Sequence, residues 1–272
     1  MREGIMAGQS GGLLGAGIVV LTLAGTACGY DRSTNPTGSG YQDTTAIAAA
    51  AGRSDFRVFT ATGDIAATLA EFRATLGDPL NGGTQGPLGG GRREIKWDGA
   101  PAEMPGDFFN TTVKAGAIFT TDGIGFRNSA NDFSEINPAY ADDFNAFSQP
   151  KTFMPVGSAE MTVDFRVPGT ETRAATRGFG VVFSDVERAG AASIKLFDAE
   201  GRSLGQYHAP VRRDAAGFSF VGVVFDLPIV AQVRITSGQR ALGEGVQDLS
   251  DGGNHDLAVM DDYLYAEPQE LP

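Results

Sequence analysis

The chain has 272 residues, enough for one large β domain or two small ones, and a formal net charge of −12 at pH 7. An acidic chain repels nucleic acid and anionic headgroups, so we expect no nucleic-acid partner. The 38 glycines and the low charged fraction of 20% favour a turn-rich, all-β protein over a helical one. The single cysteine, Cys28, excludes a disulfide within the chain and a cysteine-based zinc site.

An uncharged apolar stretch, residues 11–27, predicts either a secretory leader or a membrane helix. Cys28 follows it directly, and this placement resembles the lipidated cysteine of a bacterial lipoprotein signal. An uncleaved transmembrane helix is the alternative, because about 20 apolar residues suffice to span a bilayer. Gly11 and Gly15 have the spacing that lets membrane helices pack closely. Residues 1–28 are therefore expected to be a signal or lipoprotein leader, or an uncleaved membrane anchor.

The segment after the leader, residues 29–54, is rich in Ser, Thr, Gly and Ala and predicts a flexible tether. Residues 55–62, DFRVFTAT, alternate between apolar and polar types, as a strand does. One accessory helix is expected over about residues 64–76, where Asp64 can cap the start and Gly77 can end the helix. Its apolar residues recur at helical spacing: Ile65, Leu69, Phe72 and Leu76.

From residue 92 onward, short apolar or alternating runs are separated by turn residues. Such a succession of short strands is typical of two antiparallel sheets packed face to face. We therefore expect an all-β, jelly-roll-like sandwich over residues 55–268. The clearest strands are EIKW, AIFT, MTVDFRV, FGVVF, SIKLFD, FSFVGVVF, VAQVRIT and LAVMDDYLY.

Three segments in this order, GRREIKWDGAP, GFGVVFSDVE and VMDDYLYAEP, resemble a family of exported bacterial jelly-roll-like proteins that is largely uncharacterised. The resemblance covers roughly residues 64–268. It implies the sandwich fold and export from the cytoplasm, and it implies no established reaction.

Two adjacent aspartates, Asp261 and Asp262, interrupt the apolar run of residues 257–265. On a regular strand they would point to opposite faces, and both faces are apolar. A carboxylate buried there needs a partner or takes up a proton. Because neighbours on a regular strand point apart, the pair is not expected to flank one bond as the carboxylates of a glycosidase do.

Calcium is one candidate partner, because this ion binds carboxylates and backbone carbonyl oxygens. Many jelly-roll domains hold calcium between an early loop and the final strand, and the WDGAP loop would supply an aspartate. The candidate ligands are Asp98, Asp256, Asp261 and Asp262.

Two further kinds of partner stay open for the aspartate pair. An arginine, either Arg92, Arg93 or Arg234, could form a bidentate ion pair. Backbone N–H groups of a neighbouring loop could instead donate to the carboxylates.

We expect a non-catalytic, membrane-tethered binding or structural module of the bacterial envelope, in the periplasm or at the cell surface. His208 and His255 have no nearby serine or cysteine arrangement that would predict a nucleophile, so no enzyme is expected. The partners would be the membrane, through the N-terminal helix or a lipidated Cys28, and a surface glycan or a protein. One alternative is an accessory subunit of an integral membrane complex, held by an uncleaved helix. Another is a glycan-active hydrolase.

Overall fold

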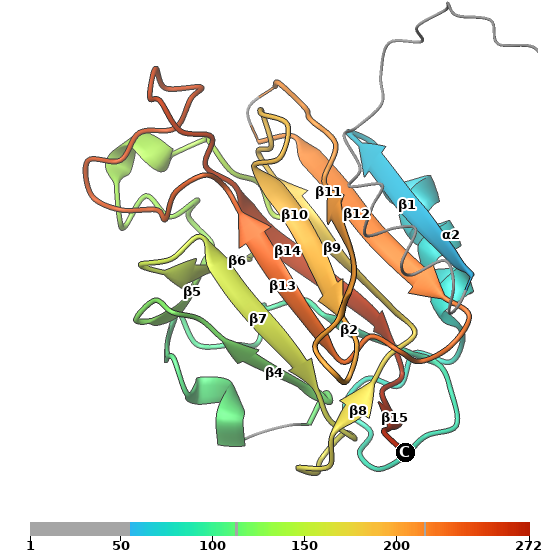
Figure 1. Ribbon diagram of the computed structural model, residues 1–272. Coiled ribbons are helices and arrows are strands. Elements are labelled where there is room, and N and C mark those ends of the chain that lie inside the picture. Colours follow the sequence, from blue (N-terminus) through green and yellow to red (C-terminus); the bar gives the residue numbers. More distant parts are fainter. Residues whose placement is uncertain (1–54, 112–113, 215) are drawn as a thin grey trace, which may run out of the picture. The chain divides into compact units, whose positions relative to one another are not determined.

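The computed structural model of the chain describes residues 55–111, 114–214 and 216–272. The expected leader and tether, with Gly11, Gly15 and Cys28, lie outside the described residues. The described part is mostly β, with two large antiparallel sheets and one α-helix (Figure 1). No helix within these ranges combines the length and the apolar character that crossing a membrane requires.

The larger sheet has the strand order β1-β12-β9-β14-β6-β5-β3, and β2 also pairs with β14. All of these pairings are antiparallel. Strand β14 holds the centre, since it pairs with β9, β6 and β2. The strands are β1 (Phe56–Thr62), β2 (Arg92–Ile95), β3 (Glu103–Pro105), β5 (Gly125–Ser129), β6 (Thr152–Val156), β9 (Gly178–Ser184), β12 (Phe218–Phe225) and β14 (Val259–Ala266).

The smaller sheet has the order β11-β10-β13-β7-β4, and β8 and β15 form a separate two-stranded pair. Two short 3-10 helices complete the described elements. The remaining bounds are β4 (Ala117–Thr120), β7 (Glu160–Phe165), β8 (Ala174–Ala175), β10 (Ala192–Phe197), β11 (Ser203–His208), β13 (Gln232–Ser237), β15 (Gln269–Glu270), η1 (Phe108–Thr111) and η2 (Pro138–Tyr140).

The main hydrophobic core takes buried side chains from both large sheets. Val181 of β9 and Tyr263 of β14 belong to it, together with Val163 of β7 and Ile235 of β13. The alternation in the β7 sequence is confirmed, because every second residue of that strand is buried. The two sheets therefore share one interior, in a sandwich-like arrangement.

Helix α2 (Ala66–Leu76) packs on the large sheet, where it contacts β1, β12 and β14 (Figure 1). Its Phe72 is fully buried, with its ring centroid 5.1 Å from that of Phe220. The close approach depends on Gly180 and Gly222, which pair with each other across β9 and β12. A Cβ atom on either glycine would lie less than 3 Å from the Phe72 ring. The bare backbone of these two glycines thus forms the seat of the helix.

Most elements expected from the sequence are observed. The expected helix over residues 64–76 corresponds to α2, and the Asp64 carboxylate accepts a hydrogen bond from the first helical N–H, that of Ala66, at 3.2 Å. The eight expected strands beyond residue 92 correspond to β2, β4, β7, β9, β10, β12, β13 and β14.

The glycine seat yields a stability prediction. Gly222→Ala would place a methyl group 2.6 Å from a ring carbon of Phe72, so we expect the free energy of unfolding to fall by about 1–3 kcal/mol, as in other overpacked cores. Chemical denaturation measures the change. Gly89→Ala is the matched control, because nothing lies within 4 Å of the added carbon there. Equal stabilities of the two variants would contradict this account of the seat.

Candidate metal centre

The two aspartates of β14 lie in a β-bulge. Met260 and Tyr263 are three residues apart, but their partners on β9 are only two apart, so Asp261 and Asp262 share one partner position. Met260 and Tyr263 consequently both face the core between the sheets. The expected strict alternation along this strand is therefore wrong, because the extra residue resets it.

The bulge brings both carboxylates to one serine, so the expectation that the pair points apart is also wrong. The Ser148 hydroxyl hydrogen bonds to Asp261 and Asp262. Asp261 also accepts the backbone N–H groups of Phe147 and Ser148, the latter at 3.0 Å. Arg73 of α2 lies 3.7 Å from the Asp262 carboxylate. Backbone N–H donors and an arginine thus both stabilise the aspartate pair.

The aspartate pair is almost fully buried, with exposed fractions of 1% for Asp261 and 0% for Asp262. Burial and the neighbouring Asp262 charge raise the pKa of Asp261 to about 8. Burial also raises the pKa of Asp262. The two carboxyl groups therefore retain a proton between them at neutral pH.

The three arginines named as candidate partners have other contacts. Arg92 pairs with Glu94 at 3.2 Å. Arg93 pairs with Glu267 at 2.7 Å, and both side chains are 1% exposed. Arg234 lies on the small sheet, where its guanidinium stands over an aromatic ring.

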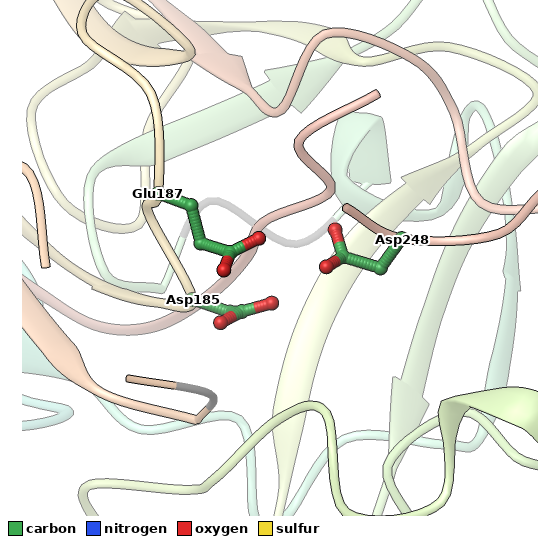
Figure 2. Close-up of side chains that lie close together, drawn as sticks. All are labelled: Asp185, Glu187 and Asp248. Carbon is green, nitrogen blue, oxygen red and sulfur yellow. The ribbon is translucent and has the colours of Figure 1, made fainter. Parts of the chain in front are cut away.

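A different group of acidic side chains converges at the end of β9 (Figure 2). Asp185 and Glu187 directly follow that strand, and Asp248 comes from the loop before β14. One carboxylate oxygen from each of the three lies within 4.8 Å of the others. Asp185 has a φ of 67°, in the left-handed region that non-glycine residues rarely adopt. Figure 2 shows the three carboxylates directed towards a common space.

The hydrogen bonds of this cluster leave acceptors unfilled. Asp185 is 0% exposed, and its Oδ1 accepts the N–H of Ala216 at 3.3 Å. Its Oδ2 has no partner among the described residues. Asp248 is held by the N–H groups of Leu257 and Ser250, each at 2.7 Å. None of the three carboxylates forms an ion pair with a cationic side chain in the described part of the chain.

Two more buried carboxylates flank the cluster. Asp256 accepts the backbone N–H groups of Glu187, at 2.9 Å, and Arg188. Asp143 is 5% exposed. Each has one carboxylate oxygen without a partner in the described ranges, and the charges of both act on Asp185. Five acidic groups are thus concentrated here, four of them buried and Glu187 half-buried.

This concentration of acidic groups raises the pKa values of several of them. Burial and the charge of Asp248 raise the pKa of Asp185 to about 9. Burial, together with the hydrogen bond to Asp248, raises that of Glu187 to about 7. Burial and neighbouring aspartates likewise raise the pKa of Asp143 to about 7 and that of Asp256 to about 6. At neutral pH the site holds protons that a bound cation would displace.

The donor set consists of oxygen alone, with no histidine or cysteine in the cluster. Hard divalent cations such as Ca²⁺ and Mg²⁺ prefer such ligands, whereas thiolates and imidazoles suit zinc. The arrangement can therefore hold a hard cation that joins the end of β9 to the loop before β14.

The four ligands expected from the sequence lie outside this group. Asp256 flanks it, Asp261 and Asp262 lie in the bulge, and the half-buried Asp98 accepts the N–H of Lys151 at 3.3 Å. A calcium ion on those four residues stays a prediction.

The sequence analysis named Asp256, in the same acidic loop as Asp248, but missed Asp185 and Glu187. The available signal was Asp-Val-Glu, two carboxylates directly after a fully buried strand. Their convergence with Asp248 depends on the pairing of β9 with β14, which the local sequence does not state.

Comparison with known protein families finds none that matches this chain, and no curated protein matches it. The resemblance to exported jelly-roll-like proteins therefore stays a prediction.

The cluster predicts a characteristic pH dependence of stability. Free carboxyl groups titrate near pH 4, so between about pH 4 and about pH 9 the metal-free folded state binds a proton at Asp185 that the unfolded chain does not. Stability must then fall as the pH rises through this window. We expect the melting temperature of chelator-treated protein to decline across it.

Asp185→Asn keeps the shape of the side chain and removes its titration, so it should flatten part of that decline. The exposed Asp214 is the matched control, and Asp214→Asn should keep the slope of the wild type. A decline as steep in Asp185→Asn as in the wild type would contradict the assignment.

Proposed function

We propose that this protein is an exported, membrane-tethered sandwich of jelly-roll type, located in the periplasm or at the cell surface of a bacterium. In this proposal it acts without catalysis, as a binding or structural module, and a calcium ion ties together loops at one end of the sheets. The apolar leader, the polar tether, the shared core of the two sheets and the oxygen-only cluster support it.

The observation that carries the proposed calcium site is the buried Asp185, whose Oδ2 is unfilled beside Glu187 and Asp248. Calcium takes about six to eight oxygens, including carboxylates and backbone carbonyls, whereas magnesium keeps several waters and uses one or two carboxylates. Three converging carboxylates, with Asp143 and Asp256 beside them, favour calcium over magnesium.

Burial of the acidic groups supports a non-catalytic role. Asp185, Asp261 and Asp262 are each at most 1% exposed. A substrate bond could meet these carboxylates only if the covering segments opened. The contacts of Asp185 and Asp261 with backbone N–H groups instead hold segments of the chain together.

Thermal melting tests the calcium proposal. Calcium added to chelator-treated, full-length protein should raise its melting temperature, because a ligand at about 100 times its dissociation constant stabilises the folded state by about 2.7 kcal/mol. Magnesium should raise it less. Asp185→Asn should lose the response and Asp214→Asn should keep it. An unchanged melting temperature of the wild type would remove calcium from the proposal.

Intact mass of the protein from native membranes tests the proposed anchoring. A mass that begins at Cys28 and includes acyl chains means a lipoprotein. The full-length mass, with partners retained in mild detergent, would favour the accessory subunit held by an uncleaved helix. Recovery of the full-length protein from the cytosol would contradict export.

A further inference from the structure

No described helix covers the outer face of the small sheet (Figure 1). The strand registers place five of its side chains in one row across β4, β7, β13, β10 and β11. In order, they are Thr120, Thr162, Arg234, Lys195 and Gln206. Their spacing is that of neighbouring strands, about 4.8 Å. The row presents hydroxyl, guanidinium, ammonium and amide groups to one extended ligand.

Two cations lie side by side in the middle of this row. Lys195 and Arg234 are directly opposite each other in the β10–β13 ladder, where like charges destabilise a sheet. Neither forms an ion pair with a carboxylate within the described residues. Both stand over the ring of Phe197, at 5.5 Å and 5.8 Å from its centroid. In a chain of net charge −12, such an unpaired cation pair fits an anionic group of a ligand.

Acidic side chains on the same face limit the charge density of that ligand. Asp164, which lies on the row next to the cations, accepts a hydrogen bond from the amide of Gln232 at 2.9 Å. Glu160 lines a hollow of about 190 Å³ together with Arg234 and Thr162. A densely charged polyanion would be repelled by these carboxylates. The ligand that fits carries isolated anionic groups separated by neutral polar units.

The geometry also favours a glycan over a peptide as the ligand of this face. An extended peptide gains its affinity by pairing its backbone with a sheet edge, and this row crosses the middle of the face. Short hydroxyl and amide side chains donate and accept hydrogen bonds, and they therefore match the hydroxyl groups of a sugar.

We propose that this face binds an oligosaccharide in which a uronic acid alternates with neutral sugars. The uronate carboxylate lies between Lys195 and Arg234, and the adjoining sugars contact Thr162 and Gln206. This inference rests on the proposed role as a binding module and names the ligand class of that role.

Calorimetry with full-length, calcium-loaded protein in detergent tests the inference. The ligand is a hyaluronan hexasaccharide, in which glucuronate alternates with N-acetylglucosamine, and chitohexaose is its neutral counterpart. The hyaluronan fragment should bind at least about tenfold more tightly than chitohexaose, and its affinity should fall with added salt. Lys195→Ala with Arg234→Ala should weaken it by at least about tenfold and leave chitohexaose unchanged. Arg213→Ala, at an exposed arginine outside this face, should leave both affinities unchanged.

The double variant removes two opposed like charges but also two cation contacts with the Phe197 ring, so its melting temperature should stay close to that of the wild type. If it does melt lower, Lys195→Gln with Arg234→Gln repeats the test with the polar stems kept. Hyaluronan binding that survives both double variants, equal binding of chitohexaose by the wild type, or no binding at all would overturn the inference. Equal binding of an acidic peptide would also overturn it. A calcium-dependent shift of the melting temperature without oligosaccharide binding would contradict this inference alone, and it would still support the proposed function.

Discussion

The need to satisfy buried carboxylates on and beside the central strand, β14, governs much of this structure. Because β14 has strand partners on both sides and core residues beneath it, water cannot solvate the acidic groups that it carries. A hydrogen-bond donor, a proton or a cation within the protein must therefore stabilise each acidic group. Glu267, just beyond the strand, accepts hydrogen bonds from the guanidinium of Arg93, which also donates to the carbonyls of Gly82 and Thr84. This one arginine thereby attaches the glycine-rich loop to the end of β14.

The same constraint has a different solution at each acidic position along the strand. At the bulge, backbone N–H groups, a shared proton and Ser148 stabilise Asp261 and Asp262, and Arg73 adds a cation from α2. Before the strand, Asp256 has two backbone donors but one unfilled oxygen. Asp262 Oδ2 also lacks a hydrogen-bond donor, but Arg73 lies 3.7 Å from it. The unfilled oxygens of Asp256 and Asp185 have no such cationic side chain in an ion pair within the described residues. A bound cation would neutralise these unfilled carboxylate oxygens.

The sequence predicts the regular parts of this fold well and its irregular parts poorly. Alternation and helical spacing predict β7 and α2, because each buries one face against a sheet. The bulge in β14 is not predictable from its own residues, since the extra residue exists only relative to β9. The very short strands β8 and β15 contain too few residues for any period to show. For the site, the acidic loop around Asp248 is visible in the sequence, but its meeting with Asp185 is a product of tertiary pairing.

The seat of α2 bears on how the domain would resist tension at its N-terminal end, where we propose that the chain is anchored. Strand β1 is the first described element of the chain and the edge strand of the large sheet, and its seven residues pair with β12. The Phe72 ring lies against Phe59 of β1 and Phe220 of β12 at once. Helix α2 thus joins the two strands through one aromatic side chain, so separating β1 from β12 under tension would also disrupt the contacts of Phe72.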